Sequence, residues 1–245
     1  MVQSDTSGGT REMVPESSEQ LLKTARERLH PSLKNPNFLV LKSRRAIFQK
    51  WIQQLRGKDL KVLDVGARYQ PYRPLFAARA QHYVACDLQK TELVDVVASG
   101  EALPFECNTY DVVVCTQVFE YFGDPYSAAR EIHRILKPDG ALLMSVVSCG
   151  PRFVDEEHWR FTSGGIRSLL APFREVTVVP ETSSVGGLIR TLNLGLYTLA
   201  PEGRLRKLIE MTACPCLNVA GLALERMALT SNDQFAPNYS VLAIK

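Results

Sequence analysis

The sequence predicts an α/β fold in which a mostly parallel sheet is covered by helices on both faces. Short apolar or β-branched runs alternate with helical segments from residue 61 onward, and this alternation is typical of parallel strands joined by crossover helices. The length of 245 residues is enough for one such domain with a substantial core. Acids at the ends of consecutive strands, Asp64 and Asp87, indicate a ligand site at the carboxyl edge of that sheet.

The N-terminal part of the chain differs from the rest in composition. Residues 1–18 are rich in Ser, Thr, Gly and Glu without apolar periodicity, so a disordered tail is expected there. Residues 19–58 are predicted to form helices, and Pro31 and Pro36 exclude a single continuous one. Residues 21–61 hold eleven Lys or Arg against two Asp or Glu. A solvated helical face accounts for this excess, and a site for anionic lipid or phosphate is the alternative.

The main domain is predicted to span residues 59–245. Strands are expected at 61–65, 82–86, 93–97, 111–115, 140–147, 174–180 and 239–244, and helices at 72–80, 124–136 and 163–171. Residues 181–237 are helical and fairly apolar, and they are too many for one loop. They are therefore expected to form a helical cap inserted before the last strand.

The bulk composition narrows the class of protein. An apolar share of 45% and a charged share of 22% are ordinary for a soluble domain, and a net charge of +3 is too small to indicate nucleic acid. No apolar leader is visible, and no stretch is expected to reach the roughly 18–20 apolar residues of a membrane span. The six cysteines lack the spacings of zinc or redox sites, so no metal site is expected. Reduced thiols and a cytoplasmic location are expected instead.

The most informative segment is KVLDVGARYQPY, residues 61–72. A short strand ends at Asp64 and breaks at Gly66, which is expected to leave backbone N–H groups directed out of the sheet, where open α/β sheets hold nucleotide-like ligands. A second strand ends at Asp87, about 20 residues further on, and a carboxylate there can accept both ribose hydroxyls of an adenosine. The pair predicts an adenosine-containing ligand.

Three further segments follow later strands: SGEALPF at 99–105, TQVFEYF at 116–122 and LKPDGALLMSVV at 136–147. In this order, the segments resemble the pattern VLDVG … D … LPF … FD.V … EH … LKPGG.L of class I S-adenosylmethionine-dependent methyltransferases of the small-molecule type. The resemblance covers roughly residues 61–180. It implies a Rossmann-like sandwich with a mostly parallel seven-stranded sheet, whose antiparallel last strand residues 239–244 would supply.

The resemblance also implies a role for each residue of a cofactor site that would bind S-adenosylmethionine. Asp64 and Gly66 would bound the methionine end, Asp87 would hold the ribose hydroxyls, Leu88 would pack on the adenine face, Gly100 and Glu101 would lie at the adenine edge, and Thr116 and Gln117 would lie near the methionine and sulfonium groups. Two positions depart from the family pattern. Arg68 replaces a glycine and is expected to pair with the methionine carboxylate, and Ser99 replaces an acid.

Three side chains are candidates for catalysis. His158 follows the fifth strand, and a neutral imidazole there can take a proton from a substrate hydroxyl as its oxygen attacks the methyl group. Glu120 and Tyr121 are the rival candidates, and an ordinary loop residue is the alternative for His158. Methyl transfer from a sulfonium is an in-line displacement with an electrophilic donor, so a general base is not obligatory.

Methyl transfer, to an oxygen of a small-molecule, glycan or lipid-like acceptor, is the function that the resemblance implies. The cap is expected to make the acceptor pocket apolar, and its basic residues would allow weak peripheral contact with a membrane. A non-catalytic binding protein with the same fold is the alternative that Arg68 and Ser99 favour. An NAD(P) enzyme is disfavoured because Arg68 and Pro71 stand where its glycine turn needs glycines. The acceptor's identity and the oligomeric state are not predicted.

Overall fold

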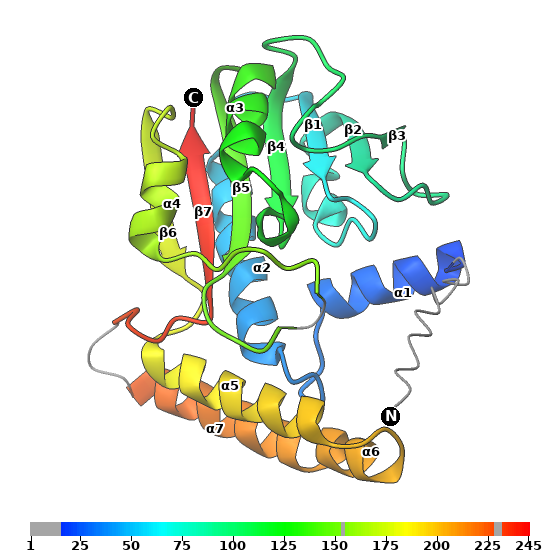
Figure 1. Ribbon diagram of the computed structural model, residues 1–245, viewed down its shortest axis with the longest axis vertical. Coiled ribbons are helices and arrows are strands. Elements are labelled where there is room, and N and C mark those ends of the chain that lie inside the picture. Colours follow the sequence, from blue (N-terminus) through cyan, green and yellow to red (C-terminus); the bar gives the residue numbers. More distant parts are fainter. Residues whose placement is uncertain (1–15, 153–154, 228–231) are drawn as a thin grey trace, which may run out of the picture.

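The computed structural model describes residues 16–152, 155–227 and 232–245, so residues 1–15 of the predicted tail lie outside the described part. Its sheet has the strands β1 (Leu60–Val65), β2 (Ala80–Asp87), β3 (Val96–Val97), β4 (Tyr110–Thr116), β5 (Leu136–Val147), β6 (Glu175–Pro180) and β7 (Asn238–Ile244). Their order is β3-β2-β1-β4-β5-β7-β6, and β7 runs antiparallel to both neighbours (Figure 1). The predicted seven-stranded sheet with an antiparallel last strand is confirmed.

Helices cover both faces of this sheet. They are α2 (Phe38–Gln54), α3 (Pro125–Ile135) and α4 (Ser163–Leu169), whereas α1 (Ser18–Leu29) lies below the carboxyl ends of β1 and β2 (Figure 1). The start of α3 follows from its sequence, because the Asp124 side chain accepts from the backbone N–H of Tyr126 and Pro125 occupies the first turn. The prediction of a helix at 72–80 is wrong. Only the 3-10 turn η1 (Arg73–Phe76) forms there, in a segment where Pro71 and Pro74 lack backbone donors.

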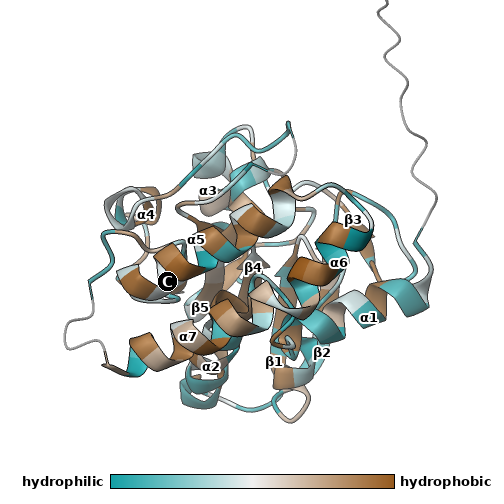
Figure 2. Cartoon of the chain, turned by 90° about the horizontal axis from the view of Figure 1, so that it is seen from below, coloured by the Kyte–Doolittle hydropathy of each residue, from teal (hydrophilic) through white to brown (hydrophobic). Residues whose placement is uncertain are grey.

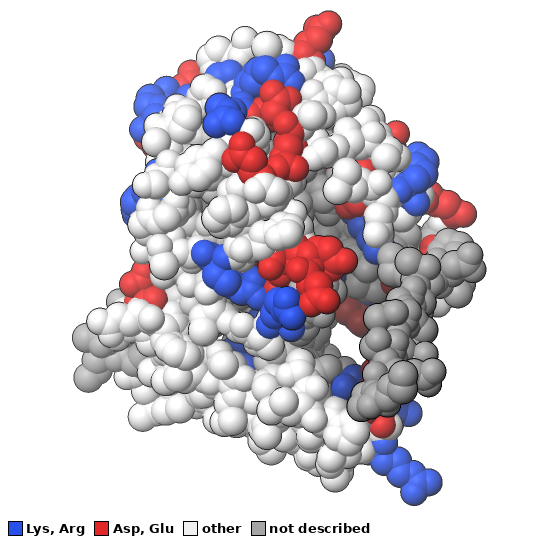
Figure 3. All heavy atoms as spheres, viewed as in Figure 1, with Lys and Arg blue, Asp and Glu red and all other residues white. Residues whose placement is uncertain are grey.

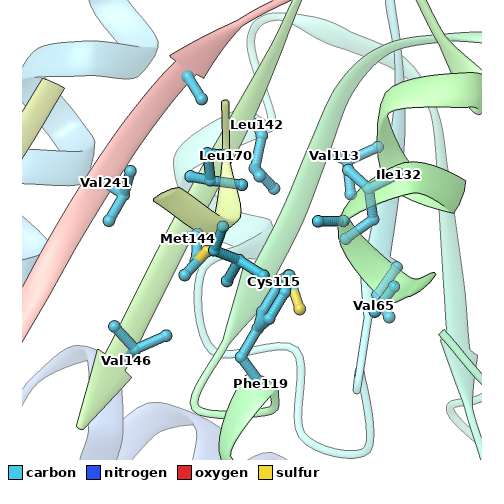
Figure 4. Packing of buried hydrophobic residues seen from close by; sticks show 14 of the residues in the cluster. Val65, Val113, Cys115, Phe119, Ile132, Leu142, Met144, Val146, Leu170 and Val241 are labelled. Carbon is cyan, nitrogen blue, oxygen red and sulfur yellow. The ribbon is translucent and has the colours of Figure 1, made fainter. Parts of the chain in front are cut away.

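The core lies on the two faces of the central strands. On one face, α3 and α4 pack on β4 and β5, and Figure 4 shows Phe119 among side chains of those strands such as Cys115 and Met144. On the other face, Phe48, Trp51 and other side chains of α2 pack with Tyr72 and Phe76 of the loop after β1. Each Å² of buried apolar surface stabilises the fold by about 25 cal/mol, so these two clusters are the main source of the protein's stability. They fix the carboxyl ends of β1, β2 and β4 side by side.

Three helices lie below the sheet: α5 (Ser184–Leu199), α6 (Arg204–Met211) and α7 (Ala213–Met227) (Figure 1). Polar contacts attach them to one another and to the N-terminal segment. The Asn218 amide donates to the backbone carbonyls of Leu33 and Asn35, at 2.7 and 2.9 Å. The Glu225 carboxylate accepts from the backbone N–H of Ser183 and of Gly186, both at 3.0 Å, so α7 caps the start of α5. We call these helices the cap.

The cap buries little of its own apolar surface. Large apolar side chains on all three helices are exposed, among them Leu188, Leu192, Leu199, Leu208, Met211 and Met227. Figure 2 shows the apolar bands on α5, α6 and α7 from below, and Figure 3 shows few charges over this part of the molecule. In length and composition, one helical segment of the described chain, Arg204–Met227, is apolar enough to cross a membrane, and 17% of its most apolar stretch is buried. The expectation that no stretch would reach this length is therefore wrong, although length and composition alone are weak evidence for a span.

Candidate active site

The loop after β1 is built around a glycine that no other residue can replace without strain. Gly66 has φ of +75°, and a Cβ there would lie 2.1 Å from Cγ2 of Val118. Its N–H and that of Ala67 donate to the carbonyl of Cys86, at 2.8 and 3.0 Å. The expectation that these N–H groups point out of the sheet is wrong, because they attach the loop to β2.

Asp64 lies beneath this loop rather than on the surface. Its side chain is buried, and Oδ2 accepts a 2.6 Å hydrogen bond from the hydroxyl of Tyr83. Burial raises the pKa of Asp64 to about 7, against the opposing effect of that hydrogen bond. Asp64 therefore links β1 to Tyr83 of β2, and it changes charge near neutral pH.

Asp87 and Leu88 stand together at the end of β2. The Asp87 oxygens accept one hydrogen bond each, from the backbone N–H of Arg68 (3.1 Å) and of Gln89 (2.8 Å). Each carboxylate oxygen has more than one acceptor site, so the carboxylate keeps capacity for a ligand. Leu88 is 69% exposed beside it. A polar acceptor next to an uncovered apolar side chain suits a ribose and the face of a base.

Arg68 extends over the same end of β2. Its guanidinium donates to the side chains of Gln89 and of Glu16, and its Nε is buried without a partner among the described residues. The ion pair with Glu16 spans 2.8 Å and is partly exposed. The structure thus places Arg68 beside Asp87, on the side predicted for the ribose. Its pairing with a methionine carboxylate stays a prediction.

The segment after β3 is held by its own contacts. A Cβ on Gly100 would lie 2.6 Å from the ring of Phe122, so this glycine permits close packing. The Glu101 carboxylate accepts from the backbone N–H of Asp124, at 2.6 Å, and from the hydroxyl of Ser99, at 3.4 Å. Glu101 therefore supports the start of α3. Its predicted place at the adenine edge is not tested by these contacts.

Gln117 marks the carboxyl end of β4, immediately after Thr116. It has φ of +57°, a conformation that is uncommon for a residue with a side chain and that clusters at functional sites. Its backbone N–H donates to the carbonyl of Ser145 (2.7 Å), and its side-chain amide donates to the hydroxyl of the same residue (3.1 Å). The amide of Gln117 is thus held in one orientation at the sheet edge.

A cavity of about 300 Å³ opens beside Gln117. Glu120 and Tyr121, from the 3-10 turn η2 (Phe119–Tyr121), line it together with side chains of α1, α2 and α5. Oε1 of Glu120 accepts from the backbone N–H of Val147, whereas Oε2 is buried without a partner among the described residues. Burial raises the pKa of Glu120 to about 7. A second hollow of about 740 Å³ lies between α1 and η1, and Asp64, Asp87 and Gln117 do not line it.

His158 lies outside the cavity that Glu120 lines. Its backbone N–H donates to the carbonyl of Glu120 at 2.7 Å, but the residue is exposed and lines a shallow surface hollow with Arg152 and Trp159. The geometry therefore favours Glu120 and Tyr121 over His158 as groups that contact a substrate.

Sequence reasoning missed a buried polar network behind the cavity. Arg44 of α2 forms two hydrogen bonds with Glu181, at 2.7 and 2.9 Å, and Ser145 and Ser240 donate to the same carboxylate. Burial alone would lower the pKa of Arg44, but the Glu181 charge raises it. Arg44 and Glu181 are 137 positions apart, and the basic composition of residues 21–61 was the only local signal.

The strand order, with a ligand edge formed by β1, β2 and β4, defines a class I methyltransferase fold. A family model described as "Methyltransferase domain" matches residues 63–144. A malonyl-[acyl-carrier protein] O-methyltransferase of Coxiella burnetii is 31% identical over 198 residues, which are 69% of this chain and 69% of that protein. The chain belongs to the S-adenosylmethionine-dependent methyltransferase family.

Two further comparisons agree with this assignment. A ubiquinone biosynthesis O-methyltransferase of Pseudomonas aeruginosa is 28% identical over 118 residues, which are 42% of this chain and 51% of that protein. The chain thus matches only about half of this relative's length. A solved S-adenosylmethionine-dependent methyltransferase of Thermotoga maritima superposes with a TM-score of 0.51 at 14% identity, over 91% of this chain and 99% of that one, which shows the shared fold.

Proposed function

We propose that the protein transfers the methyl group of S-adenosylmethionine to an oxygen of a small-molecule, glycan or lipid-like acceptor. One observation carries the proposal: in a member of this family, Asp87 and a cavity lined by Gln117 and Glu120 lie at the same edge of the sheet. Transfer to oxygen is supported by the two curated relatives, which are both named as O-methyltransferases.

The residues at the sheet edge fit the adenosine part of the donor. Asp87 keeps acceptor capacity for two ribose hydroxyls, and the exposed side chain of Leu88 beside it would be covered by the adenine. Arg28 of α1 stacks on the ring of Tyr69 at 4.3 Å and lines the cavity near Gln117, where it is available for the methionine carboxylate.

Bound S-adenosylmethionine would supply an electrophilic methyl group on its sulfonium. The residues of the chain would orient the acceptor and take its proton. Gln117 offers a fixed amide, and the unpartnered Oε2 of Glu120 is placed to accept a hydroxyl proton. Because its pKa lies near 7, Glu120 exists in both protonation states at neutral pH, which suits a general base.

A donor-consumption screen tests this function. Purified protein is incubated with methyl-labelled S-adenosylmethionine and metabolite or glycan–lipid extracts, and labelled products are separated. Wild-type protein should label a product, and Asp87→Ala should label far less at limiting donor. Label incorporation that is equal in the two proteins would show that the donor binds elsewhere.

A non-catalytic protein with the methyltransferase fold is the second candidate. Arg68 favours it, because its guanidinium bridges Gln89 and Glu16 over the end of β2. Such a protein would bind the donor weakly and label nothing in any extract. The same screen, combined with donor titration, separates the two candidates.

We further propose that the cap contacts an anionic lipid surface. The exposed leucines and methionines of α5 to α7 form its apolar face, and α6 carries Arg204, Arg206 and Lys207 against one acid, Glu210. Apolar side chains flanked by basic ones are typical of helices that lie in a membrane interface. The apolar face is exposed away from the cavity, so the expectation that it would make the acceptor pocket apolar is not supported.

A further inference from the structure

Arg190 of α5 enters the cavity from the cap, and its surroundings are unusual for a buried charge. The residue is 4% exposed. Its Nε donates to Oδ1 of Asn37 at 3.0 Å, and Nη1 donates to the carbonyl of Cys149 at 3.3 Å. Both partners are neutral. A Cβ on Gly150 would lie 2.7 Å from Nη1, so the backbone on this side makes room for the guanidinium.

Two neighbouring arginines have carboxylate partners, and Arg190 does not. Arg44 pairs with Glu181, and Arg160 pairs with Glu157. Among the described residues, no acid lies within ion-pairing distance of Arg190. Burial lowers the pKa of Arg190 to about 10, so the side chain still carries its charge at neutral pH. A buried charge without a counterion is destabilising, and a ligand anion relieves that cost.

The cavity as a whole has an excess of positive charge. The charged side chains that line it are Arg28, Arg44, Arg160, Arg190, Glu120 and Glu157. Two of the arginines are neutralised by the pairs with Glu181 and Glu157. Glu120 is then the remaining acid of this lining, beside Arg28 and Arg190, and its raised pKa leaves it partly protonated at neutral pH. With Arg28 and Arg68 left for the donor's methionine carboxylate, Arg190 remains for another anion.

We propose that the methyl acceptor carries a carboxylate or phosphate group that binds Arg190 at the α5 wall of the cavity. This inference rests on the proposed function and names the chemical class of its acceptor. A guanidinium presents paired N–H donors that match both oxyanions. The bound anion would leave the acceptor's hydroxyl free to reach Gln117 and Glu120. The arginine therefore determines specificity and is not itself a group that moves a proton.

Anion binding by the full chain tests the proposal without methyl transfer. The melting temperature is followed while malonate or inorganic phosphate is added at constant ionic strength, with NaCl as balance. Wild type should be stabilised by at least one of the two anions. Arg190→Met should need at least tenfold more anion for the same rise. The matched control is Arg167→Met, because Arg167 is exposed and donates only to the carbonyl of Val176, and it should respond like wild type.

The experiment distinguishes a carboxylate acceptor from a phosphate acceptor, and it separates loss of anion binding from loss of methyl transfer. A response to malonate alone indicates a carboxylate acceptor, and a response to phosphate alone indicates a phosphate ester. If Arg190→Met does not fold, Arg190→Lys keeps the charge and should show a weakened response. Equal responses in wild type and both Arg190 variants, or no response in wild type, would overturn the proposal. So would loss of the response in saturating S-adenosylhomocysteine, because Arg190 would then bind the methionine carboxylate. Since donor turnover is not measured, anion binding can succeed while the proposed function fails.

Discussion

Glu120 combines three properties that suit proton transfer at the cavity. Its side chain is buried, one carboxyl oxygen has no partner among the described residues, and burial brings its pKa to about 7. The other oxygen is held by the backbone of Val147, which fixes the direction of the carboxyl group. A fixed carboxyl group that titrates near the working pH is an effective general base.

The variants Glu120→Gln and His158→Ala should therefore behave differently. Glu120→Gln keeps the shape and can still accept from Val147, so it should bind the donor normally but lower methyl transfer by roughly 10²–10⁴-fold. His158→Ala should change turnover less than about threefold, since the residue lies outside the cavity. Turnover under saturating donor and acceptor provides the measurement. The reverse pattern would restore His158 as the catalytic residue.

The raised pKa of Glu120 also predicts how stability depends on pH. The unfolded chain ionises this carboxyl near its ordinary value of 4.5, whereas the folded chain keeps the proton until about pH 7. Its contribution to stability is therefore full below pH 4.5 and is lost as the pH rises through 7. Relative to Glu120→Gln, wild type should lose roughly 3 kcal/mol of unfolding free energy across this window. Urea unfolding at several pH values measures the difference, and a constant difference would contradict the raised pKa.

Arg68 is predicted to favour donor binding rather than to block it. Its partly exposed ion pair with Glu16 is worth roughly 0–1 kcal/mol, so the guanidinium can turn toward the donor's methionine carboxylate at little cost. Arg68→Gly should then weaken donor binding in a calorimetric titration, and Glu16→Ala should not. Tighter binding by Arg68→Gly would identify Arg68 as an obstruction and would favour the non-catalytic candidate.

Most strands and helices could be located from the sequence because their signals are local. Strands β4 and β5 contain the apolar runs 112–115 and 141–144, and the Asp124-Pro125 start of α3 is a direct capping signal. Only the 3-10 turn η1 forms where a helix was expected at 72–80, because Pro74 follows Pro71 and neither can donate a backbone hydrogen bond. The burial of Arg44 beside Glu181 could not be predicted from the basic composition of residues 21–61, since it depends on packing between distant segments.

The cap offers a test of the proposed lipid contact. Leu199 and Leu208 are 86% and 56% exposed, so replacing both by Glu should leave the fold intact. The double variant should bind vesicles of phosphatidylserine and phosphatidylcholine at least tenfold more weakly than wild type in sedimentation. Tyr126→Glu is the control, because Tyr126 is 50% exposed on α3, far from the cap, and should bind like wild type. Unchanged vesicle binding by the double variant would contradict the lipid contact. A wild-type dimer that the two substitutions convert to a monomer would also contradict it, because the apolar face would then bind a second copy of the chain.

At the scale of the whole molecule, the scaffold could be predicted from the sequence, whereas the cavity beside Gln117 could not. Adjacent parallel strands bring Asp64, Asp87 and Gln117 to one edge, and their order along the chain was enough to predict that. The cavity needs side chains from α1, α2, η2 and α5, which no single segment reveals. The sequence therefore predicted which strand ends share an edge of the sheet better than it predicted the arginines that line the cavity.

Calorimetric titration with S-adenosylmethionine tests the central claim most directly. Wild type should bind the donor with measurable heat at one site per chain. Asp87→Ala should lose the hydrogen bonds to the ribose and bind about 2 kcal/mol more weakly, or roughly thirtyfold. The control Asp139→Ala removes an exposed carboxylate that pairs with Arg174, and it should bind like wild type. Absence of heat in wild type, or equal affinity in wild type and Asp87→Ala, would contradict the account.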